Sequence, residues 1–80
     1  MNLSDTPNPS AKKLIINHNN KVGEYLDINN TSPESIECSI LSIVGIESVF
    51  AGPGFLTILK KENSDWESIS KEINTIFDKL

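Results

Sequence analysis

The fold is decided by the segment IESVFAGPGFLTILKK, residues 46–61. Two apolar runs, residues 46–50 and 55–59, flank Gly52-Pro53-Gly54, and glycine and proline clustered in this way require a turn. The pattern predicts a β-hairpin with a connection slightly longer than two residues. The second run is apolar on both faces, so we expect it to be a central strand. Phe55 and Leu59 lie on one of its faces, and Leu56 and Ile58 lie on the other.

A helix is expected before this hairpin, in SPESIECSILSIVG, residues 32–45. Ser32-Pro33-Glu34 supplies an N-cap, a proline for the first helical position and an acid for the positive end of the dipole. Gly45 ends the helix where a left-handed residue is favoured. Cys38 lies nearly opposite the apolar stripe, so we expect its thiol to be exposed. The predicted core stripe is Ile36, Ile40, Ile43 and Val44.

A second amphipathic helix is expected after the hairpin, in ENSDWESISKEINTIFDKL, residues 62–80. Ser64 and Glu67 have the spacing of a capping box, in which two side chains satisfy the first free N–H groups. Glu67 and Lys71 form a favourable pair one helical turn apart. The apolar residues that recur at helical spacing are Trp66, Ile69, Ile73, Ile76, Phe77 and Leu80.

The N-terminal part of the chain predicts two further strands. AKKLIIN, residues 11–17, and EYLDIN, residues 24–29, are expected to pair as an antiparallel hairpin, with Leu26 and Ile28 on one face. Residues 1–10 contain SDTPNP and are predicted to be a stiff, extended lead-in. The order is β-β-α-β-β-α in one α+β domain, residues 1–80. Two helices should cover one face of a four-stranded, mainly antiparallel sheet.

Composition excludes several functions. The net charge of −4 and the absence of arginine argue against binding nucleic acid or an anionic membrane surface. One cysteine and one histidine cannot complete a structural zinc site or an iron–sulfur cluster, so we expect neither a metal nor a cofactor. No triad or paired-carboxylate arrangement is evident, which predicts a protein without catalytic residues. His18, in a polar turn, should be solvated.

The same residues carry a family resemblance. The pattern resembles the N-terminal domain of Nfu/NifU-type iron–sulfur scaffold proteins over essentially the whole chain. Ile46 and Ile58 stand where valine is commoner, and Ser32-Pro33 lies one residue further from Gly45 than is usual, so the first helix should begin slightly early. The matching positions are Thr6-Pro7-Asn8-Pro9, Gly45, Ser48-Val49-Phe50, Gly52, Phe55, Thr57, Lys60 and Trp66.

The resemblance implies a role in cluster assembly or delivery. Family members ligate clusters through a C-x-x-C motif in a separate C-terminal domain, and these 80 residues contain no such motif. We therefore expect a non-catalytic interaction module that does not ligate the cluster itself. Its implied partners are an iron–sulfur scaffold, the C-x-x-C domain or recipient apoproteins. The alternative is a structural or dimerisation module of a larger chain, and the sequence leaves the oligomeric state open.

A partner-binding surface is predicted from the motif residues. It comprises Thr6, Pro7, Asn8, Pro9, Ser48, Phe50, Gly52, Pro53 and Gly54. For Thr6–Pro9, a brace that protects a sheet edge is the favoured alternative, and for Gly52–Gly54 it is a turn chosen for backbone geometry. The first residues, MNLSDTPNP, lack the build of a signal peptide. We expect a cytoplasmic location, or an organelle matrix if a presequence has been removed.

Overall fold

The hairpin at residues 46–61 forms the centre of the molecule in the computed structural model, which describes residues 3–18 and 20–79. Strand β4 (Ile46–Gly52) pairs antiparallel with β5 (Phe55–Lys60). Pairing continues to Gly52 and Phe55, so the connection is Pro53-Gly54, two residues and not longer. β5 also pairs with β2 (Ala11–Ile15), which confirms the prediction of a central strand.

The sheet has five strands in the order β1-β2-β5-β4-β3, and all the pairs are antiparallel. The strand beyond the four expected is β1 (Leu3–Asp5), so the described part of the N-terminal lead-in, residues 3–10, is a strand followed by a loop. The predicted hairpin between residues 11–17 and 24–29 is wrong. β2 pairs with β1 and β5, whereas β3 (Tyr25–Leu26) pairs with β4 at the opposite edge.

A turn explains why β3 is so short. The carboxylate of Asp27 accepts hydrogen bonds from the backbone N–H groups of Asn29 at 2.7 Å and Asn30 at 3.1 Å. Such a turn competes with strand pairing. Ile28, expected on the same face as the buried Leu26, is therefore 55% exposed.

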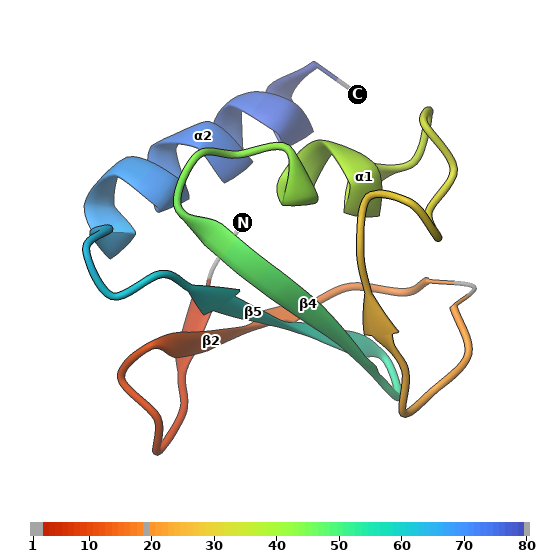
Figure 1. Cartoon of the computed structure of the whole chain (residues 1–80), viewed down its shortest axis with the longest axis horizontal. Helices are drawn as coiled ribbons and strands as arrows, with labels where there is room; N and C mark the ends of the chain where they lie inside the picture. Colours follow the sequence, from red (N-terminus) through yellow and green to blue (C-terminus); the bar gives the residue numbers. More distant parts are fainter. Residues whose placement is uncertain (1–2, 19, 80) are drawn as a thin grey trace.

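Two helices cover one face of the sheet, as predicted (Figure 1). They are α1 (Ile36–Leu41) and α2 (Trp66–Asp78). Alternate residues of the strands pack against the helices in one apolar cluster. The α1 region contributes Ile40 and Ile43, and α2 contributes Ile69 and Ile73. The strand residues buried in that cluster are Leu14, Leu26, Ile46, Val49, Ala51, Leu56 and Ile58.

The first helix is shorter than predicted at both ends. Ser32 and Ser35 close a turn through a 3.0 Å backbone hydrogen bond, and Ser35, not Ser32, is the N-cap, accepting from the N–H of Cys38 at 3.1 Å. The helix thus begins late, not early. Because the helix ends at Leu41, Val44 lies beyond it and does not join the core stripe as predicted. Val44 is 96% exposed. Cys38 is partly buried, not exposed as expected.

Gly45 follows α1 with a φ of 102°, which agrees with its predicted role. A Cβ there would lie 2.5 Å from Oγ of Ser64, a further reason for glycine. Ser64 was expected to cap α2, but Asp65 does so, because its carboxylate accepts from the N–H of Ser68 at 2.8 Å. That hydrogen bond lowers the pKa of Asp65. Leu80 of the predicted stripe lies outside the described residues.

Candidate functional site

The face of the sheet opposite the helices is uncovered and largely apolar (Figure 1). We call it the open sheet face. Outward positions of an antiparallel sheet are usually polar when that face meets water. Here Lys13 is the charged residue among them. Strand register assigns to this face Ser4, Ala11, Lys13, Ile15, Tyr25, Ser48, Phe50, Gly52, Phe55, Thr57 and Leu59.

An aromatic pair lies at the β3 edge of the open sheet face. The rings of Tyr25 and Phe50 are partners across β3 and β4, with centroids 5.0 Å apart in an edge-to-face arrangement. Tyr25 is 67% exposed, and Ile15 at the other side of the face is 63% exposed. Large apolar groups left in water on one face are typical of an interaction surface.

A second aromatic group lies near the β4–β5 turn. The ring of Phe55 lies against Gly52, where an added Cβ would approach ring atoms to 2.2 Å. The ammonium of Lys13 lies 4.4 Å from the centroid of the same ring. Gly52 therefore lets the ring lie flat on the sheet, and Lys13 supplies a cation above it.

A hollow of about 260 Å³ joins the N-terminal loop to this face. It brings Asn8 beside Ser48 and Phe50, three of the residues predicted for partner binding. Sequence reasoning missed Tyr25, which shares the hollow. The remaining lining residues are Ala11, Thr57 and Leu59.

The loop of residues 6–10 is held tightly between β1 and β2. The hydroxyl of Thr6 lies 2.9 Å from the carbonyl oxygens of both Asn8 and Ala11, and Oδ1 of Asn8 accepts from the N–H of Ser10 at 2.9 Å. Nε1–H of Trp66 on α2 donates to the carbonyl of Pro9 at 3.0 Å. These bonds are those expected of a brace, while Asn8 alone of this loop reaches the open-face hollow.

The β4–β5 turn is held by His18. One ring nitrogen, Nε2, lies 2.6 Å from the carbonyl oxygen of Gly52 and 3.0 Å from that of Phe55. The other, Nδ1, accepts from the N–H of Asn20 at 3.2 Å, so the proton is on Nε2. His18 is thus half-buried and bonded, not solvated as expected. Pro53 and Gly54 remain exposed at the turn.

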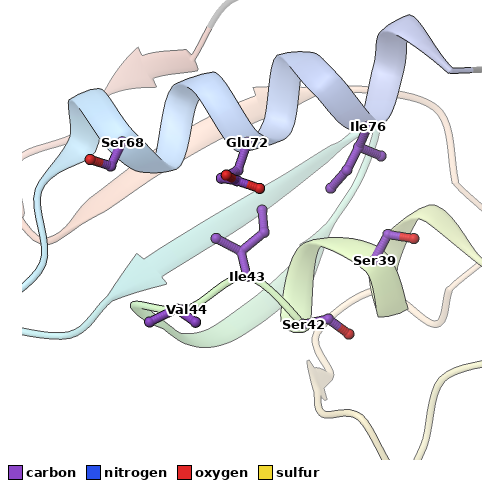
Figure 2. A pocket seen from close by; sticks show the side chains of 7 residues that line it. All are labelled: Ser39, Ser42, Ile43, Val44, Ser68, Glu72 and Ile76. Carbon is purple, nitrogen blue, oxygen red and sulfur yellow. The ribbon is translucent and has the colours of Figure 1, made fainter.

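A second hollow lies on the other side of the molecule, between the two helices (Figure 2). We call it the interhelical groove, and its volume is about 520 Å³. Figure 2 shows Glu72 and Ile76 extending from α2 toward Ile43. Ser39, Ser42, Val44 and Ser68 complete its lining.

The described side chains offer few groups that could ligate a metal ion. Within residues 3–18 and 20–79, no three His, Cys, Asp or Glu side chains lie close enough together to hold a metal ion. Cys38 lies on α1, and both nitrogens of His18 are engaged in hydrogen bonds. In the same part of the chain, neither helix is long and apolar enough to cross a membrane.

Comparison with known proteins gives a match over the whole chain. The family model described as "Scaffold protein Nfu/NifU N terminal" matches residues 1–80. A protein named conserved virulence factor C from Staphylococcus aureus (strain bovine RF122 / ET3-1) is 31% identical over 80 residues, covering 96% of this chain. The protein of the same name from Staphylococcus haemolyticus is 30% identical over 78 residues, covering 94%. This chain spans 21% of the length of each.

Solved structures share the fold. The crystal structure of protein SAV1430 from Staphylococcus aureus matches with a TM-score of 0.76 at 19% identity, covering 96% of this chain and 95% of that one. A solution structure from Staphylococcus epidermidis matches with a TM-score of 0.66 at 23% identity, covering 99% and 94%. At these identities the likeness supports the arrangement of strands and helices described above.

Proposed function

This chain belongs to the Nfu/NifU N-terminal family, and from that premise we propose that it is a non-catalytic interaction module that assists iron–sulfur cluster assembly or delivery. Its partner is a cluster-bearing scaffold, a C-x-x-C domain of the Nfu type or a recipient apoprotein. The family membership supports the pathway. The open sheet face supports the mode of action, because it offers a partner an apolar surface at the positions of the family motif.

The observation that carries the proposal is the gathering of motif residues on one uncovered face. Ser48, Phe50 and Gly52 are consecutive outward positions of β4, and Tyr25 packs edge-to-face on Phe50. Tyr and Phe are enriched at the centres of protein–protein interfaces, where they bury much apolar area and lose little side-chain entropy. The face is therefore suited to recognition of a protein surface.

The ligand supply of the chain sets a limit to its role. A cluster normally takes four cysteine ligands, and this chain has one. The half-buried Cys38 and the hydrogen-bonded His18 lie on different elements. The cluster is accordingly the cargo of the partner, and this chain contributes protein contacts.

The test is the affinity of the chain for an Nfu-type C-terminal domain that carries C-x-x-C, measured by calorimetry with and without its cluster. We expect the variant Phe50→Ser to weaken binding about tenfold, as for a central interface residue. Ile28→Ser is the matched control, because it also replaces a large apolar side chain by serine, at a position that is 55% exposed in a turn outside the open sheet face.

The positions of the predicted surface are tested in the same assay by alanine substitution at Thr6–Pro9, Ser48, Phe50 and Pro53. Affinities that all stay within error would contradict the proposal. Self-association of the free chain with no response to scaffold, C-x-x-C domain or apoprotein would instead favour the structural role. Binding that accelerates transfer of a cluster to an apoprotein would support the proposed function.

A further inference from the structure

The interhelical groove is a second surface, on the opposite side of the sheet from the open sheet face (Figures 1 and 2). Small side chains on the facing sides of the two helices leave this space open. They are Ser39 and Ser42 on the α1 side and Ser68 on α2. α1 ends at Leu41, so Val44 emerges beyond it almost fully exposed, at 96%. The floor contains Ile43, which is buried, and Ile76, which is half-buried.

The hydroxyl groups that line the groove are placed to act as acceptors. Each of its three hydroxyl groups donates within its own helix or cap: Ser39 to the carbonyl of Ser35 at 3.3 Å, Ser42 to that of Cys38 at 2.9 Å and Ser68 to the carboxylate of Asp65 at 3.3 Å. With its proton engaged, a hydroxyl presents only lone pairs to other groups.

Glu72 gives the groove its charge. Its carboxylate extends into the space between the helices, opposite Ile43 (Figure 2). Neither ion pair recorded among the described residues includes it, since Lys71 pairs with Glu67 at 3.8 Å and Lys12 pairs with Asp5 at 3.1 Å. Lys79 lies two turns away, about 10 Å along the axis of α2. The lining residues include one acid and no base.

We propose that the interhelical groove binds an amphipathic helix of a partner protein that places a lysine or arginine on Glu72 and apolar side chains on Ile43, Val44 and Ile76. The acceptors and the carboxylate complement a cation, and the apolar residues complement one stripe of a helix. An anionic segment would meet Glu72 unfavourably. A second copy brings another chain of net charge −4, so it is disfavoured.

This inference concerns a surface that the proposed function does not use, and it is tested without the cluster partner. The probe is a helical peptide of about 14 residues with leucine on one face and lysine on the other. It is titrated into the ¹⁵N-labelled chain. We expect saturable shifts in the amide signals of residues lining the groove. A peptide with glutamate in place of each lysine should give none.

Variants of the chain separate the specific contact from its general negative charge. Glu72→Gln should weaken binding about threefold, as for an exposed ion pair, and Glu72→Lys about tenfold. Val44→Ser should weaken it about fivefold through lost apolar contact. Glu47→Gln is the matched control, since Glu47 is an exposed carboxylate of β4 outside the groove. Its affinity should stay near that of the unaltered chain.

Several results would overturn the inference. These are equal binding of the glutamate peptide, an equal loss in Glu47→Gln and Glu72→Gln, shifts confined to the open sheet face, or no shift with either peptide. Shifts of the same residues on raising the protein concentration alone would assign the groove to a second copy. Phe50→Ser should leave peptide binding unchanged, so failure here and failure of the proposed function are distinguishable.

Discussion

The two faces of β5 contain similar apolar residues in very different surroundings. Leu56 and Ile58 are 1% and 0% exposed beneath the helices, whereas Phe55 and Leu59 on the other face are only partly covered. Both faces would look like core in a sequence. The difference lies in what covers them: two helices on one side, and side chains of the sheet itself on the other.

This contrast separates residues that stabilise the fold from residues that are available to a partner. A side chain enclosed by the helices loses its contacts when it is shortened, and a cavity remains. A side chain on the open sheet face is already in contact with water, so shortening it removes little from the folded state. Stability and partner binding should therefore respond to different substitutions.

The largest expected effect is on the covered face. Ile58→Ala should lower the free energy of unfolding by about 3 kcal/mol through lost burial and a cavity. For a small domain that is a large share of the total stability. Urea unfolding followed by circular dichroism measures it, with Leu59→Ala as the control from the opposite face. Equal losses for the two variants would break the comparison.

A smaller effect is expected where the N-terminal loop meets α2. Trp66→Phe keeps an aromatic ring but removes the Nε1–H that donates to the carbonyl of Pro9 at 3.0 Å. The loss should be about 1 kcal/mol, with a fall of roughly 4–8 °C in the unfolding temperature. An unchanged melting curve would show that the loop does not depend on this bond.

The cap of α2 should make stability depend on pH. The hydrogen bond from the N–H of Ser68 lowers the pKa of Asp65 from its ordinary value of 3.8. The carboxylate thus adds stability above that value, and the contribution is lost as pH falls through the lowered pKa of the folded state. Asp65→Asn should melt a few degrees below the unaltered chain at pH 7.

The difference between the two melting temperatures should shrink as the pH falls below 3.8, the ordinary pKa of the carboxyl group, and through the lowered pKa of Asp65 in the folded state. Thermal unfolding at pH values from 7 down to 2 measures it. Glu47→Gln, an exposed acid outside the cap, is the control for the change in net charge. A constant difference across this range would contradict the role assigned to the cap.

The smallest effect on stability is expected on the open sheet face. Tyr25→Ser removes a ring that is 67% exposed, so the free energy of unfolding should change by about 0.5 kcal/mol or less. The same variant should bind a C-x-x-C partner domain about tenfold more weakly. Urea unfolding and calorimetry on one sample measure both. A large loss of stability would place Tyr25 with the core residues.

Strong local signals in the sequence predicted much of this fold. The Gly-Pro-Gly turn, the glycine after the first helix and the apolar stripe of Ile69 and Ile73 agree with the structure. The errors lie where local and long-range preferences differ. Asp65 and Ser35 lie close to the serines expected as caps, and spacing alone does not decide which side chain reaches the free N–H groups.

Strand pairing could not be predicted from neighbouring sequence. The strands β2 and β3 follow one another along the chain, yet they lie at opposite sides of the β4–β5 hairpin, because that hairpin pairs on both of its edges. The open sheet face followed from this pairing. The apolar residues on both sides of β5 predicted a central strand. Only the strand order shows that one of these sides is left uncovered and that Tyr25 and Asn8 lie beside Phe50.

The most direct test of the account is to map the contact surface of a C-x-x-C domain on this chain. The ¹⁵N-labelled chain is titrated with the unlabelled partner domain, and the amide shifts are assigned residue by residue. We expect the shifts to concentrate on β3, β4 and β5 at Tyr25, Ser48, Phe50 and Thr57, with α1 and α2 little changed. Shifts confined to the two helices, or none at saturating partner, would contradict it.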